Sequence, residues 1–557
     1  MVKKFFGLLS KELVGLHEAA YLLAFFTFLS QLLGLVRDRM LASTFGASAA
    51  LDAYYAAFRI PDLIFVAIAS VASVSILVPF IIERLQKSEL ETREFLNAIF
   101  SFFAILMVVV SIAAFFLAPT LLGLIFPKII AGQYGAELIT MTRWLLLSPI
   151  LLGFSNLLAS VTQAKHRFFS YAISPIFYNA GIIFGLLVFY PLFGLIGLAL
   201  GVVLGALFHL AVQIISVGKF FPRFRLPFNF QIIKQVVALS FSRTLALSAS
   251  QIALLVLVAL AAYLAAGSVS IFNFSWNLQS VPLAIVGASY TVALFPTISR
   301  LFGNGEKEKF FQEMLTAARH ITFWSVPIII LFIVLRAQIV RTILGSGNFD
   351  WADTRLTAAA LALFAVSILA QSLILLFVRG YYAGGNTKKP LIINLFSAAL
   401  IVVFAFGFLW LFKHWEFFRY FTESLLRVDN VAGAEVLMLP LGFSVAQIVN
   451  AAIYWFYFAR RFPTFSPIVS RTFFEVFSTS VIMGFVAYRA LNVFDKIFNL
   501  ETLPGIFFQG FFAGLIGIAV GVVILILLKN QEIKEVWTTL HHKIWRAKPI
   551  APEPESL

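Results

Sequence analysis

The chain has 557 residues, of which 61% are hydrophobic and only 12% are charged, and its formal net charge is +15; its mean hydropathy is +0.96. A soluble globular domain would carry about a quarter charged residues, so the composition excludes that class and predicts an all-α polytopic membrane protein. The absence of cysteine excludes disulfides and thiolate metal sites. No basic run is interleaved with aromatic residues, so the positive charge indicates cytoplasmic loops rather than nucleic-acid binding.

The first segment, residues 1–19, carries lysines around an apolar run too short for a cleaved signal peptide, and we expect an interfacial helix there. Apolar runs of about 20 residues, enough to cross a bilayer, fill most of the remaining chain. We expect about fourteen spans, at 20–45, 53–82, 95–118, 137–164, 168–190, 193–217, 234–263, 268–299, 313–335, 355–383, 389–412, 431–459, 472–493 and 504–528.

Lysine and arginine are distributed unequally between the two sets of connecting loops. The loops on the side of the two termini, together with the basic tail 529–557, hold about three times as many basic residues as the opposite loops. Because cytoplasmic loops are the basic ones, we expect both termini to be cytoplasmic and the turn at Gly46 to face outward.

Three landmarks recur at a nearly constant separation. Pro79 in "LVPFIIERL" matches Pro296 in "LFPTISRL", Pro175 and Asn179 match Pro390 and Asn394, and Ser30-Gln31 matches Ser250-Gln251. By subtraction the offsets are 217, 215 and 220 residues. This repeat predicts two homologous six-helix lobes, at 20–217 and 218–459 (the second preceded by a cytoplasmic linker), followed by two further helices within 460–528.

The stretch 31–62 concentrates charge inside apolar sequence. It contains Arg37, Asp38, Arg39, Asp52, Arg59 and Asp62, although a charge at the centre of a membrane helix costs roughly 2.5–3.5 kcal/mol. Helical spacing puts Arg37 on a stripe of polar and small residues of one helix, and Asp52, Arg59 and Asp62 on a stripe of the next.

Arg37 and Arg59 lie at about equal distances from the turn at Gly46, hence at similar depth in antiparallel helices. One hypothesis makes them two walls of a cationic, substrate-binding pocket with the three aspartates beside them. In the alternative, Arg37 and Arg39 reach to the membrane interface and Arg59 pairs with Asp38 for structure alone.

Two other intramembrane positions are second candidates for substrate binding. Arg243 follows two serines within the seventh span, and Asn277 lies on a stripe of polar and small residues in the eighth. Such stripes are more often seams of helix packing than walls of a cavity.

The motifs of soluble and membrane-embedded enzymes were not found. The sequence has no P-loop, HExxH or GxSxG motif and no carboxylate pair on an aqueous face, and its seven histidines are scattered. We therefore expect a protein that is not an enzyme and has no cofactor or metal.

Two six-helix lobes with a cationic pocket are typical of an alternating-access transporter. Arginine suits phosphate because its planar fork donates two parallel hydrogen bonds, so we expect a substrate that bears phosphate. Without a nucleotide motif, the membrane potential or a Na⁺ or H⁺ gradient would drive transport. An exporter of other amphiphiles and a non-transporting scaffold remain alternatives.

Four segments of the sequence are distinctive. The most specific is "LLGLVRDRMLASTFGASAALDAYYAAFRIPD" with the following "LVPF"; others are "GSVSIFNFSWNLQSVPLAIVGASYTVALFPTISRLF", "RFFSYAISPIFYNAG" and "GNTKKPLIIN". These segments resemble the lipid II flippases of the MurJ (MviN) family, within the multidrug/oligosaccharidyl-lipid/polysaccharide exporter superfamily. The resemblance extends over about the whole chain, including about fourteen helices.

This resemblance implies a flippase that moves lipid-linked peptidoglycan precursor to the outer leaflet of the bacterial inner membrane, with cavity arginines engaging its pyrophosphate. By position these would be Arg37, beside Asp38, and Arg59. Association with membrane lipids and cell-wall synthesis machinery is implied too, and nucleic acid is not. The chain departs from the family pattern at Gln31, at 64–76 and at Trp276-Asn277, where the family has charged residues. A related flippase for another polyprenyl-linked glycan is therefore the alternative.

Overall fold

The computed structural model describes residues 16–69, 74–226 and 229–545, and every regular element in these ranges is a helix. Among the described residues, 11 helices are long and apolar enough to cross a membrane, or 12 when Trp351–Ala365 and Ile368–Ala383 count as one span. This confirms the all-α polytopic fold. The total of fourteen stays a prediction, as does the expected helix within 1–19, of which residues 1–15 lie outside the described ranges.

The described residues form two compact units. Unit 1 comprises residues up to 281 together with 343–364 and 385–450. Its helices are α2 (Leu16–Phe45), α3 (Ala49–Ala57), α4 (Arg59–Ile64), the π-helical η1 (Phe65–Ala69), α5 (Val74–Lys87), α6 (Glu89–Ile125), α7 (Pro127–Ile130), α8 (Gly135–Leu145), α9 (Leu147–Ala164), α10 (Phe168–Phe184), η2 (Gly185–Phe189), α11 (Tyr190–Phe193), α12 (Leu195–Val217), η3 (Gly218–Phe220), α13 (Phe230–Tyr263), α14 (Ser268–Pro282), α18 (Trp351–Ala365), α20 (Lys388–His414), α21 (Glu416–Leu426), η5 (Ala434–Leu437) and the first half of α22 (Met438–Arg461).

Unit 2 comprises residues 282–342, 365–384 and 451 onward. Its helices are η4 (Leu283–Ala288), α15 (Ser289–Gly303), α16 (Lys307–Val334), α17 (Arg336–Ile343), α19 (Ile368–Ala383), the second half of α22, α23 (Phe465–Phe494), α24 (Leu503–Leu527) and α25 (Gln531–Trp545). The expected basic tail thus begins with a helix, α25; residues 546–557 lie outside the described ranges.

The second expected span, 53–82, is divided rather than continuous. α3 ends before Phe58, α4 begins at Arg59, and the π-helical η1 follows directly. The corresponding part of the eighth span contains another π-helical segment, η4, and the two begin 218 residues apart by subtraction (Phe65 and Leu283). π-helical turns occur mostly as single insertions, frequently at functional sites.

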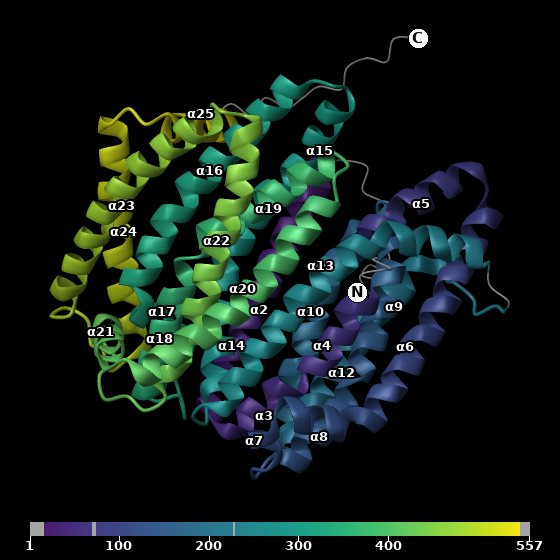
Figure 1. Ribbon diagram of the computed structural model, residues 1–557, viewed down its shortest axis with the longest axis horizontal. Helices are drawn as coiled ribbons and strands as arrows, with labels where there is room; N and C mark the ends of the chain where they lie inside the picture. Colours follow the sequence, from purple (N-terminus) through teal and green to yellow (C-terminus); the bar gives the residue numbers. More distant parts are fainter. Residues whose placement is uncertain (1–15, 70–73, 227–228, 546–557) are drawn as a thin grey trace. The chain divides into compact units, whose positions relative to one another are not determined.

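Helices α10 and α12 pack against each other in unit 1 (Figure 1). Their close packing depends on glycines that face each other between α10–η2 and α12. A Cβ atom built on Gly181 would lie 2.3 Å from the Cα of Gly205, and one on Gly185 would lie 2.4 Å from the Cα of Gly201. Only small residues let two backbones approach this closely in a membrane protein. This seam fixes α10, which carries Asn179 toward the candidate site.

The turn between α2 and α3 is held by the first turn of α18 and the segment before it. Gly46 has a φ of +62°, and a Cβ there would lie 2.5 Å from the carbonyl oxygen of Asn348. The backbone amide of Asn348 donates to Ser43 at 2.9 Å, and the Asp353 carboxylate accepts from the Ala47 amide at 2.9 Å. Glycine is favoured at this position because it tolerates both the left-handed conformation and the contact.

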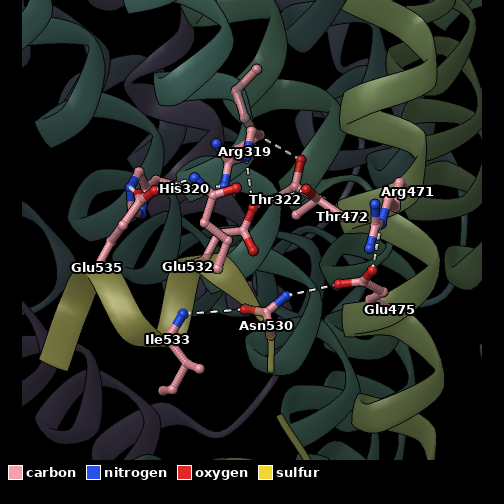
Figure 2. Close-up of polar contacts among 12 residues, drawn as sticks. Arg319, His320, Thr322, Arg471, Thr472, Glu475, Asn530, Glu532, Ile533 and Glu535 are labelled. Atoms are coloured by element: carbon pink, nitrogen blue, oxygen red, sulfur yellow. Dashed lines mark hydrogen bonds and ion pairs between the residues drawn. The ribbon is translucent and has the colours of Figure 1, made fainter. Parts of the chain in front are cut away.

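In unit 2, a polar cluster joins α25 to α16 and α23 (Figure 2). Asn530 accepts from the Ile533 amide at 3.1 Å, which caps the start of α25. Glu532 accepts from Arg319 at 2.7 Å and from Thr472 at 2.9 Å. The side chains of Glu532 and Arg319 are 2% and 11% exposed, so the helix is held by a buried ion pair.

Removing Glu532 should detach α25, because taking one partner from a buried ion pair costs about 3–5 kcal/mol. We expect Glu532→Ala to abolish the hydrogen-exchange protection of the α25 amides. The matched control is Arg471→Ala, which removes an 83% exposed arginine from an i,i+4 pair with Glu475 worth about 0.3–0.5 kcal/mol. Equal protection in the Glu532→Ala variant and the control would contradict the assignment.

Candidate functional site

The charged stretch of α2 contains a tightly joined pair of neighbouring residues. Arg37 donates from Nε at 2.9 Å and from Nη2 at 2.8 Å, both to Oδ1 of Asp38. The Arg37 side chain is 22% exposed and that of Asp38 only 4%. The guanidinium therefore carries its own counterion, which lowers the cost of placing it in an apolar bundle.

Two asparagines from distant parts of the chain complete this pair. Arg37 donates from Nη1 to Oδ1 of Asn179 on α10 at 3.2 Å. Asp38 accepts at its other oxygen, Oδ2, from Asn277 on α14 at 2.9 Å. Asn179 is itself oriented by Ser30, whose Oγ accepts from its Nδ2 at 3.3 Å. The ion pair thus links α2, α10 and α14 within unit 1.

Arg59 lies at the break between α3 and α4 and is less completely partnered than Arg37. Its Nη2 donates to Oδ1 of Asn273 at 2.5 Å. Its Nε is buried and has no hydrogen-bond partner among the described residues, and the same holds for the hydroxyl of Tyr55, one helical turn earlier. Buried donors without acceptors are rare in native proteins, and such a group calls for an explanation such as a bound ion or ligand.

Tyr55 brings the two arginines into one site. Arg37, Asp38 and Arg59 all lie within electrostatic reach of its phenol group. Asp62, one turn after Arg59, and Arg37 act in the same way on Tyr178 of α10. Each of the predicted residues Arg37, Asp38, Arg59 and Asp62 therefore lies near at least one of these two tyrosines.

Asp52 has a different environment from the other predicted site residues. Its carboxylate accepts from the amides of Gly267 at 2.7 Å and Ser270 at 2.8 Å, and from the Ser270 hydroxyl at 2.7 Å. Asp52 is only 4% exposed, and these bonds cap the first turn of α14. This geometry gives Asp52 a structural role. It joins α3 to α14 and so positions Asn273 and Asn277.

Arg243 and Asn277 were the second candidates. Asn277 lies in the site, as the donor to Asp38. Arg243 lies on α13 and is partly exposed; its membership of the site stays a prediction. In the sequence, Asn179 stands out only as part of the repeat. Its contact with Arg37 joins residues 142 positions apart, so no local sequence pattern predicts it.

Comparison with known proteins places this geometry in context. Residues 41–512 match the family model described as "Lipid II flippase MurJ". The chain belongs to this family. The match covers most of the chain and includes Arg59 and Asn277 of the candidate site.

Named MurJ proteins align over much of their length. A probable lipid II flippase MurJ of Thermotoga maritima is 27% identical over 522 residues, 92% of this chain and 96% of the relative. A lipid II flippase MurJ of Burkholderia cenocepacia is 25% identical over 388 residues, 68% of this chain and 75% of the relative.

Solved structures share the fold. A lipid II flippase MurJ in an inward closed conformation has a TM-score of 0.73 at 20% identity, covering 92% of this chain and 99% of that one. An inward-facing multidrug resistance MATE transporter of the MOP superfamily has a TM-score of 0.62 at 15% identity, covering 79% and 96%. The match over residues 41–512 confirms the expected MurJ family, and with it a multi-pass membrane transporter rather than an enzyme.

Loss of the Asp52 carboxylate should destabilise this MurJ-family protein. Asp52→Ala removes three hydrogen bonds from a buried helix cap, and we expect a loss of about 3 kcal/mol in unfolding free energy, measured as a lower Tm in detergent. Asp429→Ala, at an exposed aspartate of the same unit, is the control and should leave the Tm unchanged. A Tm of the Asp52→Ala variant equal to the control would refute the capping role.

Proposed function

We propose that this chain translocates lipid II, the lipid-linked peptidoglycan precursor, from the cytoplasmic to the outer leaflet of the bacterial inner membrane. The observation that carries the proposal is the pair of buried, unpartnered donors, Arg59 Nε and the Tyr55 hydroxyl, beside the Arg37–Asp38 pair. The substrate is that for which its relatives are named, and the donors supply a chemical reason for it.

The pyrophosphate of such a substrate fits these donors. A phosphate oxygen accepts charge-assisted hydrogen bonds, and a guanidinium presents its donors in a planar fork that matches it. Arg59 has Nε free for this purpose, while Asn273 holds Nη2. Arg37 is bound to Asp38 at two nitrogens and its charge is offset by that carboxylate, so it offers a phosphate less than Arg59 does.

The transport cycle would follow from the superfamily architecture. Two homologous lobes would alternate in exposing the site to either side of the membrane. The sequence contains no P-loop, so the membrane potential or a Na⁺ or H⁺ gradient would supply the energy. With both termini cytoplasmic, as the basic loops predict, the Gly46 turn faces the outer side.

One observation favours a second substrate. The family's charged positions in the eighth span hold Trp276 and Asn277, and here Trp276 packs against Phe272, Phe364 and Phe443 with centroids 6.2, 5.5 and 5.0 Å away. An aromatic cluster thus stands where the resemblance expects an acidic residue. A flippase for another polyprenyl-linked glycan is therefore the alternative function.

Neutralising Arg59 should strongly reduce transport. We expect Arg59→Gln to lower the translocation of fluorescent lipid II in proteoliposomes at least tenfold, because loss of one charge-assisted contact to a buried anion costs about 1.5–3 kcal/mol. Arg59→Lys should keep the charge yet remain impaired, since an ammonium cannot reproduce the fork.

Arg300→Gln removes an exposed arginine and should transport normally, which controls for net charge. Complementation of a flippase-depleted bacterium gives the second readout. Wild-type expression that fails to relieve lipid II accumulation would instead support the alternative glycan. Normal translocation by a well-inserted Arg59→Gln variant would exclude the proposed site.

A further inference from the structure

A large groove lies in unit 1 between α6 and the α8–α9 pair, away from the residues of the candidate site. Its volume is about 760 Å³, within the range of roughly 300–1,000 Å³ that is usual for ligand sites. Exposed apolar side chains line it, among them Ile112, Phe116, Trp144 and Leu147. A lining of this kind suits a hydrocarbon chain and not a free phosphate ion.

Arg143 is the single charged side chain among the residues that line this groove. Its Nε donates to the carbonyl oxygen of Phe115 at 3.2 Å, and its guanidinium carbon lies 4.7 Å from the centroid of the Phe115 ring. Within the described part of the chain, no carboxylate lies at ion-pair distance from Arg143, and its two Nη groups donate to no protein acceptor. The cation is held in place while two of its donor groups stay available.

The sequence explains why Arg143 is held there. Pro119 lies inside α6, and proline lacks the amide that would donate to the carbonyl four residues earlier. That carbonyl belongs to Phe115, the acceptor that Arg143 uses. Pro119 therefore frees an acceptor within the helix, and this acceptor together with the ring of Phe115 orients the guanidinium.

A second polar atom belongs to the same groove. Ser111, one helical turn before Phe115, is 5% exposed and lines the groove, and its hydroxyl has no hydrogen-bond partner among the described residues. A buried hydroxyl without a partner is unfavourable in an apolar setting. An oxygen-bearing ligand in the groove would satisfy it.

The depth of Arg143 matches that of a lipid headgroup. It lies eight residues after the start of α8 at Gly135, or about 12 Å along the helix. The α8–α9 span has 30 residues, more than the 20 or so that the hydrocarbon core requires. Arg143 is thus near the polar boundary of the bilayer, on the side that the basic loops predict to be outer.

We propose that this groove is a binding site for an anionic phospholipid, with one acyl chain against α6 and α8–α9 and the phosphate on Arg143. Charge complementarity selects an anionic lipid over a zwitterionic or uncharged one, since Arg143 has no carboxylate partner among the described residues. This site is independent of the proposed substrate site. It would tether a lipid of the surrounding leaflet to unit 1.

Photo-crosslinking in nanodiscs tests the proposal. The probe is phosphatidylglycerol with a photoactivatable acyl chain, present as a minor component of phosphatidylcholine, and mass spectrometry maps the labelled peptides. We expect labelling of α6 and α8–α9 with wild type, and about tenfold less with Arg143→Gln, because one charge-assisted contact is lost. Diacylglycerol with the same chain should label these helices equally weakly in both proteins.

Two further variants separate binding from folding. Arg460→Gln removes another arginine that lies over a phenylalanine, 4.5 Å from the Phe456 centroid, but is outside the groove lining, and it should label as wild type. Pro119→Ala restores a helical amide that competes for the Phe115 carbonyl, and it should reduce labelling while Arg143 is retained.

Equal labelling of wild type and Arg143→Gln by phosphatidylglycerol would overturn the proposal. So would equal labelling of wild type by phosphatidylglycerol and diacylglycerol, because the groove would then be filled without regard to the headgroup. A second copy of the chain that occupied the groove would exclude the probe. A dimer that Phe116→Asp dissociates would therefore also overturn the proposal.

Discussion

A charge within an apolar helical bundle must be matched by a counterion or by hydrogen bonds, and this requirement organises unit 1. Asp38 is central to it, because one oxygen holds Arg37 and the other accepts from Asn277. Isolated, either charge would be expensive to bury, but together with their asparagines they form a satisfied group. The helices α2, α10 and α14, which are distant in the sequence, meet at this group as a consequence.

The buried charged side chains of unit 1 differ in how many hydrogen-bond partners the protein gives them. This difference distinguishes a structural residue from a candidate substrate-binding residue. Asp52 has three donors and joins α3 to α14. Arg37 has a carboxylate and an amide. Arg59 has one amide and keeps a buried nitrogen that finds no acceptor in the described part of the chain. A protein tolerates incomplete satisfaction where a ligand completes it, so the substrate site is expected at Arg59 rather than at the better-paired Arg37.

Local features of individual helices position the remaining polar side chains. The break at Phe58 sets Arg59 at the start of a new helix, and Pro119 frees the carbonyl that Arg143 uses. Glycines between α10 and α12 allow the contact that fixes Asn179. In unit 2, Asn530 caps the start of α25 and Glu532 anchors this helix on α16 and α23. Each of these local features fixes the position of a polar group.

The sequence by itself determined the membrane class, the all-helical fold and the stretch where charge is concentrated. These are local properties: hydropathy over about 20 residues marks a span, and helical spacing puts Arg59 and Asp62 on one face. The resemblance of 30–80 also indicated the family correctly.

Only the tertiary structure decided how each charge is used. Asp38 meets Asn277 across 239 positions and Asp52 meets Ser270 across 218, so no periodic pattern could distinguish a helix cap from a ligand-binding carboxylate. Arg143 gave no signal in the sequence, because its importance depends on a proline in another helix. Pairing between distant residues is set by how helices pack, and a linear pattern does not contain that information.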